Sequence, residues 1–284
     1  MRDIVLVPVY SRPDYLRVCL EYLARAEGIA DKEVWICIDR GRSLIREFYE
    51  VLNDFRNQIN FSVIIRPEHS YMGNSMNVLE AYKEAYQTDA KFIYLVEDDV
   101  VVQPDFFTWH EAVQKTGDYF CSVAYRCLRN TGTFINCTDP EAYFTTAQDY
   151  ASIGVGWRRE RLAPVIKHAC EEYYKNLEPY ILKHFPCNRF CTSYAEQDGL
   201  IMRVMADVKG ITAWPYVPRA FHFGVNGYNR PRGPRLSYAE IKEMIYSPEK
   251  IAAADLDFHD VEPMPKGPTS SWDASKLHCI QRFA

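Results

Sequence analysis

Short apolar runs alternate with amphipathic segments along the first hundred residues of the chain. The runs predict four strands, and the segments between them, in which apolar residues recur every three or four positions, predict three helices. Because the runs are continuously apolar rather than alternating, we expect strands that are buried on both faces. The predicted strands are 3–10, 33–39, 61–67 and 91–99, and the predicted helices are 11–26 with Ser11 as its cap, 41–55 and 74–87.

This order of elements is typical of an α/β fold with a mostly parallel, doubly wound sheet and helices on both faces. The second half of the chain is less regular. Its pattern predicts loops over 130–150, helices around 158–174 and 194–205, and a strand over 214–223. After residue 255, Pro and polar residues predict a tail that wraps the surface. We find no repeat, and expect one domain with a C-terminal extension.

In such a sheet, ligands bind beyond the carboxyl ends of the parallel strands. All four predicted strands end in polar side chains, so we expect these side chains to meet in one crevice. The strand ends are 10–12, 39–41, 66–69 and 97–99.

The fourth strand end is the most informative, because Glu97, Asp98 and Asp99 follow an apolar run directly. Adjacent carboxylates repel one another and attract a cation. Their hard oxygen atoms suit Mg²⁺ or Mn²⁺, which usually complete their shell with substrate phosphates. The sequence lacks a Gly-rich phosphate-binding loop, so the phosphates would be held through the metal. The alternative is a solvated acidic turn.

Composition narrows the partners and the compartment. The net charge of −5 gives no general reason to expect nucleic acid or an anionic membrane as a partner. The start of the chain has no cleavage pattern, and no apolar run approaches the ~20 residues of a membrane helix. The nine cysteines are an odd number, which is typical of reduced thiols. We therefore predict a cytoplasmic protein, in a bacterial cell or a phage-infected host.

One group of His and Cys residues contains zinc-type ligands. Their spacing matches no common zinc finger, which favours buried thiols and ordinary histidines. The group consists of His168, Cys170, His184, Cys187 and Cys191.

Four blocks, in the same order along the chain, carry a resemblance to a known family. They are the acidic triplet 97–99 with Pro104, Asp105, Phe106 and Phe107; Gly154, Gly156 and Trp157; the segment 196–203; and Arg219, Phe223, Gly224 and Gly227. With the opening segment VPVYSRPDYL, they resemble a GT-A glycosyltransferase, and most of all the N-acetylglucosaminyltransferase I family. The resemblance covers roughly residues 3–230.

The resemblance implies a GT-A, Rossmann-like α/β fold with a mostly parallel twisted sheet flanked by helices. It implies a glycosyltransferase domain over 1–235, with a donor half of about 1–103 and an acceptor half of about 104–235. Residues 236–284 would form a C-terminal helix and a wrapping tail. The family carries a membrane anchor and a stem, which this sequence lacks. We therefore expect an acceptor other than a secretory N-glycan, and no membrane partner.

The same resemblance assigns the candidate metal and donor-sugar residues. Asp99 resembles the direct ligand of Mn²⁺ (or Mg²⁺), and Glu97 and Asp98 resemble the residues that hold the ribose and the donor sugar. His222 is a second candidate ligand, because many GT-A enzymes use a late His on the metal. A His between two Phe residues is alternatively a packed core residue.

Asp198 is the candidate general base, because it matches an acid on a short helix of the family. In direct inverting transfer, one carboxylate takes the proton from the acceptor hydroxyl as it attacks the anomeric carbon. Glu196 is the competitor. An acid at a helix start is alternatively a capping residue.

Further residues are candidates for the nucleotide-sugar site. Asp39 would accept from the uracil imide and Arg12 would reach the base or a phosphate, unless the two are a surface pair. Tyr71, Gly73 and Asn74 open a helix whose N-terminus favours phosphate, although any helix start looks the same. Pro8 and Tyr10, in the first matching block, complete the donor set. Trp157 would form the floor of the sugar pocket, or belong to the core.

The segment 218–235 has four Arg and no acidic residue. Its Gly, Asn and Pro content is typical of a mobile loop that closes over the donor, or of a solvated linker.

These observations predict an inverting, metal-dependent glycosyltransferase that uses a nucleotide sugar, with UDP as the expected nucleotide. The acceptor hydroxyl would lie on a glycan or on a hydroxymethylated DNA base, as in phage DNA modification. The alternatives are a catalytically silent sugar- or nucleotide-binding module, which would need neither the triplet nor Asp198, and a nucleotidyltransferase. A nucleotidyltransferase normally shows a Gly-rich, Lys-containing signature after the first strand, which this chain lacks.

Overall fold

The computed structural model describes residues 2–39, 45–67, 73–125, 143–186, 195–224, 236–244 and 278–282. Within these ranges the strands are β1 (Asp3–Val9), β2 (Lys32–Ile38), β3 (Phe61–Ile65), β4 (Phe92–Leu95), β5 (Val100–Val102), β6 (Cys121–Val123), β7 (Tyr143–Ala147), β8 (Val155–Arg158), β9 (Thr212–Pro215), β10 (Ala220–His222) and β11 (His278–Arg282). The α-helices are α1 (Pro13–Leu23), α2 (Ile45–Phe55), α3 (Gly73–Tyr86), α4 (Phe106–Val113), α5 (Ala163–Ile166), α6 (Glu171–Lys175), α7 (Leu177–His184), α8 (Gln197–Asp207) and α9 (Tyr238–Met244). Two 3₁₀ helices are η1 (Ile29–Asp31) and η5 (Arg159–Leu162).

The described strands form a nine-stranded sheet in the order β11-β7-β9-β6-β8-β4-β1-β2-β3 and a separate two-stranded sheet of β10 and β5. β1 pairs in parallel with β2 and β4, and β2 with β3. β8 runs antiparallel to both β4 and β6. The predicted α/β class with a large sheet flanked by helices is confirmed, and the antiparallel pairs of the large sheet are β4 with β8, β6 with β8 and β7 with β9.

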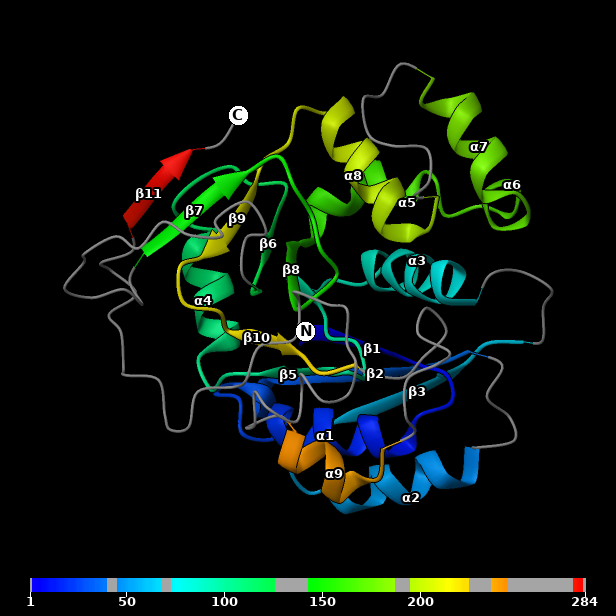
Figure 1. The fold of residues 1–284 in the computed structure, drawn as a ribbon, viewed down its shortest axis with the longest axis vertical. Coiled ribbons are helices and arrows are strands. Elements are labelled where there is room, and N and C mark those ends of the chain that lie inside the picture. The colour runs from blue at the N-terminus through cyan, green and yellow to red at the C-terminus, as the bar shows by residue number, and fades with distance from the viewer. Residues whose placement is uncertain are drawn as a thin grey trace.

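Helices cover both faces of the sheet (Figure 1): α1 and α2 lie on one side of β1–β3, and α3 lies on the other. Side chains of β1 alternate between the two cores that result. Ile4 and Leu6 pack with α3 residues, whereas Val5 and Val7 pack with α1 and α2 residues. Because both sets are buried, the continuous apolar run in the sequence reflects a strand covered on both faces, as predicted.

Several local predictions were wrong. The first helix is not capped by Ser11, because Arg12 occupies the cap position and makes no capping hydrogen bond with its side chain. The fourth strand ends at Leu95, so the acidic triplet lies in a turn rather than within a strand. The segment 214–223 is divided between β9 and β10, and the predicted loop 130–150 contains β7.

The predicted C-terminal extension is described only over 236–244 and 278–282. α9 packs against α1 through Ile241, and β11 pairs in parallel with β7. The division of the chain at residue 235 stays a prediction. No helix in the described ranges is both long and apolar enough to cross a membrane.

Candidate active site

A turn between β4 and β5 holds the acidic triplet. β4 lies beside β1 in the centre of the sheet and is completely buried, so its carboxyl end brings the turn to the sheet edge. The amide of Val100 donates to the carbonyl oxygen of Glu97 over 3.0 Å and closes the turn. Asp98 and Asp99 are buried, with 3% and 7% of their surface exposed, whereas Glu97 is partly exposed. The solvated acidic turn is therefore not what the structure shows.

The guanidinium of Arg12, just after the end of β1, neutralises part of this charge. It forms an ion pair with Asp98, and its Nη1 lies 2.8 Å from Asp99 Oδ2. Burial disfavours the charged guanidinium, but Asp98 and Asp99 outweigh burial and raise the pKa of Arg12. The predicted role of Arg12 in reading the nucleotide stays a prediction; the structure places its side chain on the carboxylates.

His222 lies far along the sequence but reaches the acidic turn, where it forms a corner of the site with Asp99. β10 pairs antiparallel with β5, with His222 opposite Val100, and the amide of Phe223 donates to the carbonyl oxygen of Asp99 over 2.9 Å. As a result, His222 Nε2 lies 3.4 Å from Asp99 Oδ2. Burial alone would raise the pKa of Asp99, but Arg12 and His222 hold it well below its usual range.

The corner has room because residue 224 is a glycine. A Cβ atom at Gly224 would lie 2.3 Å from Asp99 Oδ2 and 2.8 Å from His222 Nε2. Contacts that short force a neighbour to move. Gly224 therefore allows the backbone to approach the carboxylate and the imidazole.

The donor set of this corner fits Mn²⁺ or Mg²⁺ bound together with a substrate. Asp99 Oδ1 and His222 Nδ1 are buried and make no hydrogen bond within the described structure. No group of three or more His, Cys, Asp and Glu side chains in the described ranges is placed to hold a metal ion. One carboxylate and one imidazole would thus supply two ligands, and a metal that binds substrate phosphates needs few from the protein.

Asp198 lies in the first turn of α8 and faces this acidic turn through Ser152. Ser152 Oγ donates to Asp198 Oδ2 over 3.2 Å and to Glu97 Oε2 over 3.4 Å. Burial raises the pKa of Asp198 to about 6, and the charge of Glu196 acts in the same direction. Hydrogen bonds from Ser152 and Gln197 oppose this shift.

Glu196, the competing candidate for the base, is placed differently. It is the exposed N-cap residue of α8, and its side chain makes no capping hydrogen bond. The helix start is instead held by Ser75, whose Oγ accepts from the amide of Gln197 over 3.1 Å. The geometry thus favours Asp198 over Glu196 as the candidate base. Asp198 is not the capping residue of α8.

The predicted donor residues are only partly brought together. Asp39 is buried at the end of β2, and its amide donates to the carbonyl oxygen of Val9 at the end of β1. Tyr10 follows β1 and is 49% exposed. Pro8 is buried within β1, and Gly73 is the buried first residue of α3. Tyr71 and the arginines Arg230, Arg232 and Arg235 lie outside the described residues.

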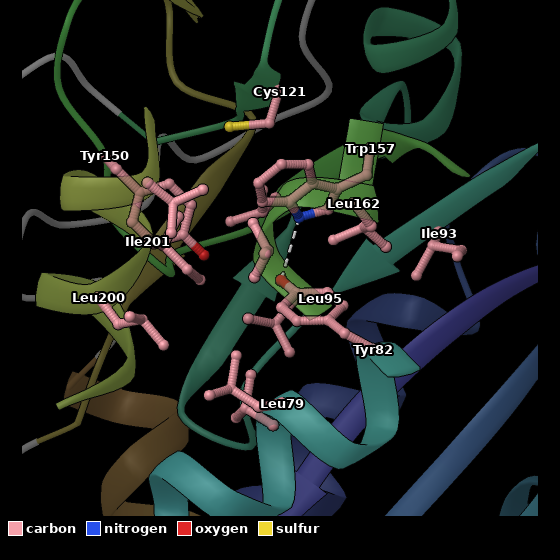
Figure 2. Close-up of a cluster of buried hydrophobic side chains, with 14 of the residues drawn as sticks. Leu79, Tyr82, Ile93, Leu95, Cys121, Tyr150, Trp157, Leu162, Leu200 and Ile201 are labelled. Carbon is pink, nitrogen blue, oxygen red and sulfur yellow. Dashed lines mark hydrogen bonds between the residues drawn. The ribbon is translucent and has the colours of Figure 1, made fainter. Parts of the chain in front are cut away.

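Trp157 is a core residue in this structure. Its side chain has no exposed surface, and its Nε1 donates to Tyr82 Oη over 3.1 Å (Figure 2). Its ring packs edge-on against Phe120, with the centroids 5.0 Å apart. Of the two interpretations left open by the sequence, the geometry favours the core over the floor of a sugar pocket.

The two glycines before Trp157 also serve packing. Gly154 has a φ of 65°, and a Cβ there would lie 2.6 Å from the Cβ of Ala220. A Cβ at Gly156 would lie 2.5 Å from His110 Nδ1. These contacts explain the two glycines without a ligand.

Two of the matching blocks contact each other. Arg219 is completely buried, and its Nε donates to Asp105 Oδ2 over 3.2 Å. The amide of Gln103 donates to the carbonyl oxygen of Arg219 over 2.9 Å. These contacts join the two blocks. They also hold the start of β10 in place, and His222 with it.

Sequence reasoning missed Ser152 and the close approach at Gly224. A lone serine in a loop gives no motif, and only the position of Gly224 just after His222 was a usable signal. In the His and Cys group, His168 Nδ1 lies 2.9 Å from Tyr180 Oη, and Cys187 and Cys191 fall outside the described residues.

Comparison with solved structures shows which proteins have a similar fold. TarS 1-349 from S. aureus in complex with UDP-GlcNAc is similar with a TM-score of 0.50 and 14% identity, over 91% of this chain and 68% of that one. The mannosyltransferase PcManGT from Pyrobaculum calidifontis, in complex with GDP-Man and Mn²⁺, has a TM-score of 0.47 and 12% sequence identity to this chain. The match covers 92% of this chain and 66% of that one. The chain thus spans about two thirds of the length of these solved chains. No curated protein matches it.

The model of the family described as "Glycosyltransferase like family 2" matches residues 4–251. That span includes the acidic turn, Ser152, Asp198 and His222, and the fold is the GT-A, Rossmann-like one that the resemblance implied. The chain belongs to glycosyltransferase family 2, and it is a glycosyltransferase.

Proposed function

We propose that this glycosyltransferase moves a sugar from a nucleotide donor to an acceptor hydroxyl in a single displacement that inverts the anomeric carbon. The observation that carries the proposal is the convergence of Asp198 on the acidic turn. Ser152 connects Asp198 to Glu97, two residues before Asp99 in the same turn. This contact supports a site in which Asp198 would serve the acceptor while the acidic turn would serve the leaving group.

UDP is the proposed nucleotide. TarS 1-349, which shares the fold, was solved with UDP-GlcNAc, and this supports a UDP-sugar as donor. Asp39 at the end of β2 is the proposed partner of the uracil imide, and Tyr10, exposed just after β1, is a further proposed donor-site residue. Glu97 and Asp98 are proposed to hold the ribose and the donor sugar.

Mn²⁺ or Mg²⁺ is the proposed cofactor, held by Asp99 and His222 together with the donor diphosphate. Bound there, the ion would neutralise the charge that develops on the diphosphate. The chain's own contribution is to hold the two ligands close together, through the pairing of β5 with β10 and the space left by Gly224.

Asp198 is proposed to act as the general base. The acceptor O–H bond breaks and its proton goes to the Asp198 carboxylate. The acceptor oxygen bonds to the anomeric carbon, and the bond from that carbon to the diphosphate oxygen breaks, with its electrons leaving on the nucleotide. One base and one displacement give inverted linkage.

The acceptor hydroxyl is proposed to lie on a glycan or on a hydroxymethylated DNA base. The narrower likeness to the N-acetylglucosaminyltransferase I family is not supported by the comparisons and does not enter this proposal. The family match argues against a nucleotidyltransferase. A silent binding module would also need no carboxylate held beside the acidic turn, as Ser152 holds Asp198.

Asp198→Asn tests this proposal. The amide is nearly isosteric but cannot take the proton, so we expect the turnover rate to fall by roughly 10²–10⁴-fold while donor affinity is kept. Because the pKa of Asp198 is raised to about 6, the wild-type carboxylate is ionised only above that pH. The wild-type rate should therefore rise with pH through about 6, and the variant should lack this limb. The measurement is nucleotide release across a panel of nucleotide sugars with Mn²⁺.

Asp207→Asn is the matched control, since Asp207 is an exposed acid at the other end of the same helix. It should behave like the wild type. An Asp198→Asn enzyme within about threefold of the wild-type rate, or a product with retained linkage, would contradict the proposed mechanism. Glu196→Gln would then be the next variant to measure.

A further inference from the structure

Ser152 occupies a fixed position between two acids that come from different parts of the fold. It lies between β7 and β8, and only 7% of its surface is exposed. Tyr150 before it is buried in the core. Gly154 after it has a φ of 65°, and its carbonyl oxygen accepts from the amide of Ala124 over 2.7 Å. Contacts on both sides therefore restrain the backbone that carries Ser152.

The hydroxyl contacts one oxygen of each acid, at 3.2 Å for Asp198 Oδ2 and 3.4 Å for Glu97 Oε2. A hydroxyl has one proton to donate, so it donates fully to one carboxylate at a time. The shorter distance favours Asp198. The other oxygen of Asp198, Oδ1, is buried and makes no hydrogen bond within the described structure. Its hydrogen-bonding capacity is unmet until a donor reaches it.

We propose that Ser152 is a positioning residue for the transfer reaction: its hydroxyl holds Asp198 by Oδ2, at a set distance from Glu97, so that Oδ1 faces the incoming acceptor hydroxyl. This inference rests on the proposed function, in which Asp198 is the base. Nothing in the sequence pattern singles out Ser152. A side chain that fixes one carboxylate oxygen lowers the entropy cost of aligning the other for proton transfer.

The titratable groups that face Asp198 are acids and phenols. Glu196 lies on its own helix, and Glu97 lies on the acidic turn. Three tyrosines on packed elements, Tyr82, Tyr150 and Tyr173, have pKa values raised mainly by burial and in small part by Asp198. None of these groups stabilises an ionised Asp198, whereas the hydrogen bonds from Ser152 and Gln197 act against their effect.

Ser152→Ala is the test. We expect the turnover rate to fall about tenfold, the effect of losing one hydrogen bond to a charged group, with little change in the KM for the donor. The hydrogen bond from Ser152 favours the ionised carboxylate, so its loss should raise the pKa of Asp198. The acid limb of the pH–rate profile should therefore move to higher pH. Ser152→Thr keeps the hydroxyl and should restore most of the rate and the position of the limb.

Ser122→Ala is the matched control. Ser122 is a fully buried serine that hydrogen-bonds to His110, Gln114 and the carbonyl oxygen of Gly156, away from the acids. Its loss should lower stability in urea unfolding but leave the acid limb where it is. A Ser152→Ala enzyme with a wild-type acid limb and a rate within twofold of wild type overturns the inference.

The role of Asp198 and the role of Ser152 can be disproved separately. If Asp198→Asn is active, the proposed base is wrong. If Asp198→Asn is inactive while Ser152→Ala matches the wild type in rate and pH profile, only the role of Ser152 is wrong.

Discussion

Asp99 is the residue on which most of the local electrostatics depends. A guanidinium nitrogen of Arg12 lies 2.8 Å from its Oδ2, and His222 Nε2 lies 3.4 Å from the same oxygen. A divalent ion that binds Asp99 must share or displace these positive partners. We therefore expect weak metal binding by the protein alone and much tighter binding when a diphosphate adds negative charge.

Gly224→Ala is predicted to damage this corner specifically. The new Cβ would lie 2.3 Å from Asp99 Oδ2 and 2.8 Å from His222 Nε2, so the carboxylate and the imidazole must separate. We expect at least a tenfold loss of Mn²⁺ affinity in the presence of UDP, measured by titration calorimetry.

Gly28→Ala is the control for this glycine. Its φ of 83° strains any side chain, but a Cβ there meets no atom within 4 Å. It should lower stability and leave Mn²⁺ binding unchanged. Equal Mn²⁺ affinity in Gly224→Ala and in the wild type would show that Asp99 and His222 do not bind the ion together.

Among the elements, β8 connects the two parts of the large sheet. It runs antiparallel between β4 and β6 and carries Trp157 into the core on the α3 side. Trp157 meets Tyr82 of α3 (Figure 2), and its ring also packs against Phe120 just before β6. Its contribution is to join these elements, and the site benefits indirectly, because the segment that leads into β8 carries Ser152.

Trp157→Phe is predicted to cost stability rather than donor affinity. The variant loses the hydrogen bond to Tyr82 Oη and leaves a partial cavity, together about 2–3 kcal/mol of unfolding free energy. Urea unfolding measures the first effect, and the KM for the donor measures the second. A raised KM for the donor with unchanged stability would instead indicate that Trp157 forms part of the sugar pocket.

At the scale of the whole molecule, one buried ion pair links the start of α4 to the approach to β10. Arg219 has no exposed surface, and Asp105 precedes the first residue of α4. The two residues are far apart in sequence, so their pairing closes a long loop of chain. Removing one partner of a buried pair is much more costly than removing a surface pair.

Arg219→Met is predicted to lower the free energy of unfolding by about 3–5 kcal/mol, because the carboxylate of Asp105 keeps its burial and loses this guanidinium. Arg17→Met is the control, since its partner Asp54 is exposed and such pairs contribute about 0–1 kcal/mol. Both values come from urea unfolding. Similar losses in the two variants would mean that the buried pair does not hold the two segments together.

The sequence was sufficient for the first part of the fold, where β1 is buried on both faces and β3, although only partly buried at the sheet edge, still has an apolar run. β1, β2 and β3 and the helices between them follow from apolar runs and helical periodicity. β6 and β8 were not predicted, because they have only three and four residues and β8 contains a glycine. Strands that short are specified by the neighbours they pair with rather than by their own pattern.

The site was predictable residue by residue but not as an arrangement. Asp99, His222 and Asp198 were chosen from their blocks, and the structure brings the first two together and places the third across Ser152. The contact of Arg12 with Asp98 depends on how β1 lies beside β4. The spacing of the two residues along the chain therefore does not predict this contact. The metal and base roles stay predictions.

The pairing of β5 with β10 also bears on how an enzyme of this kind can diverge. His222 sits opposite Val100 through strand register, so the two proposed ligands are joined by backbone hydrogen bonds and not by the length of chain between them. Insertions and deletions in the loops of the intervening segment can then accumulate without separating Asp99 from His222. New acceptor preferences can arise there while the chemistry on the donor is inherited unchanged.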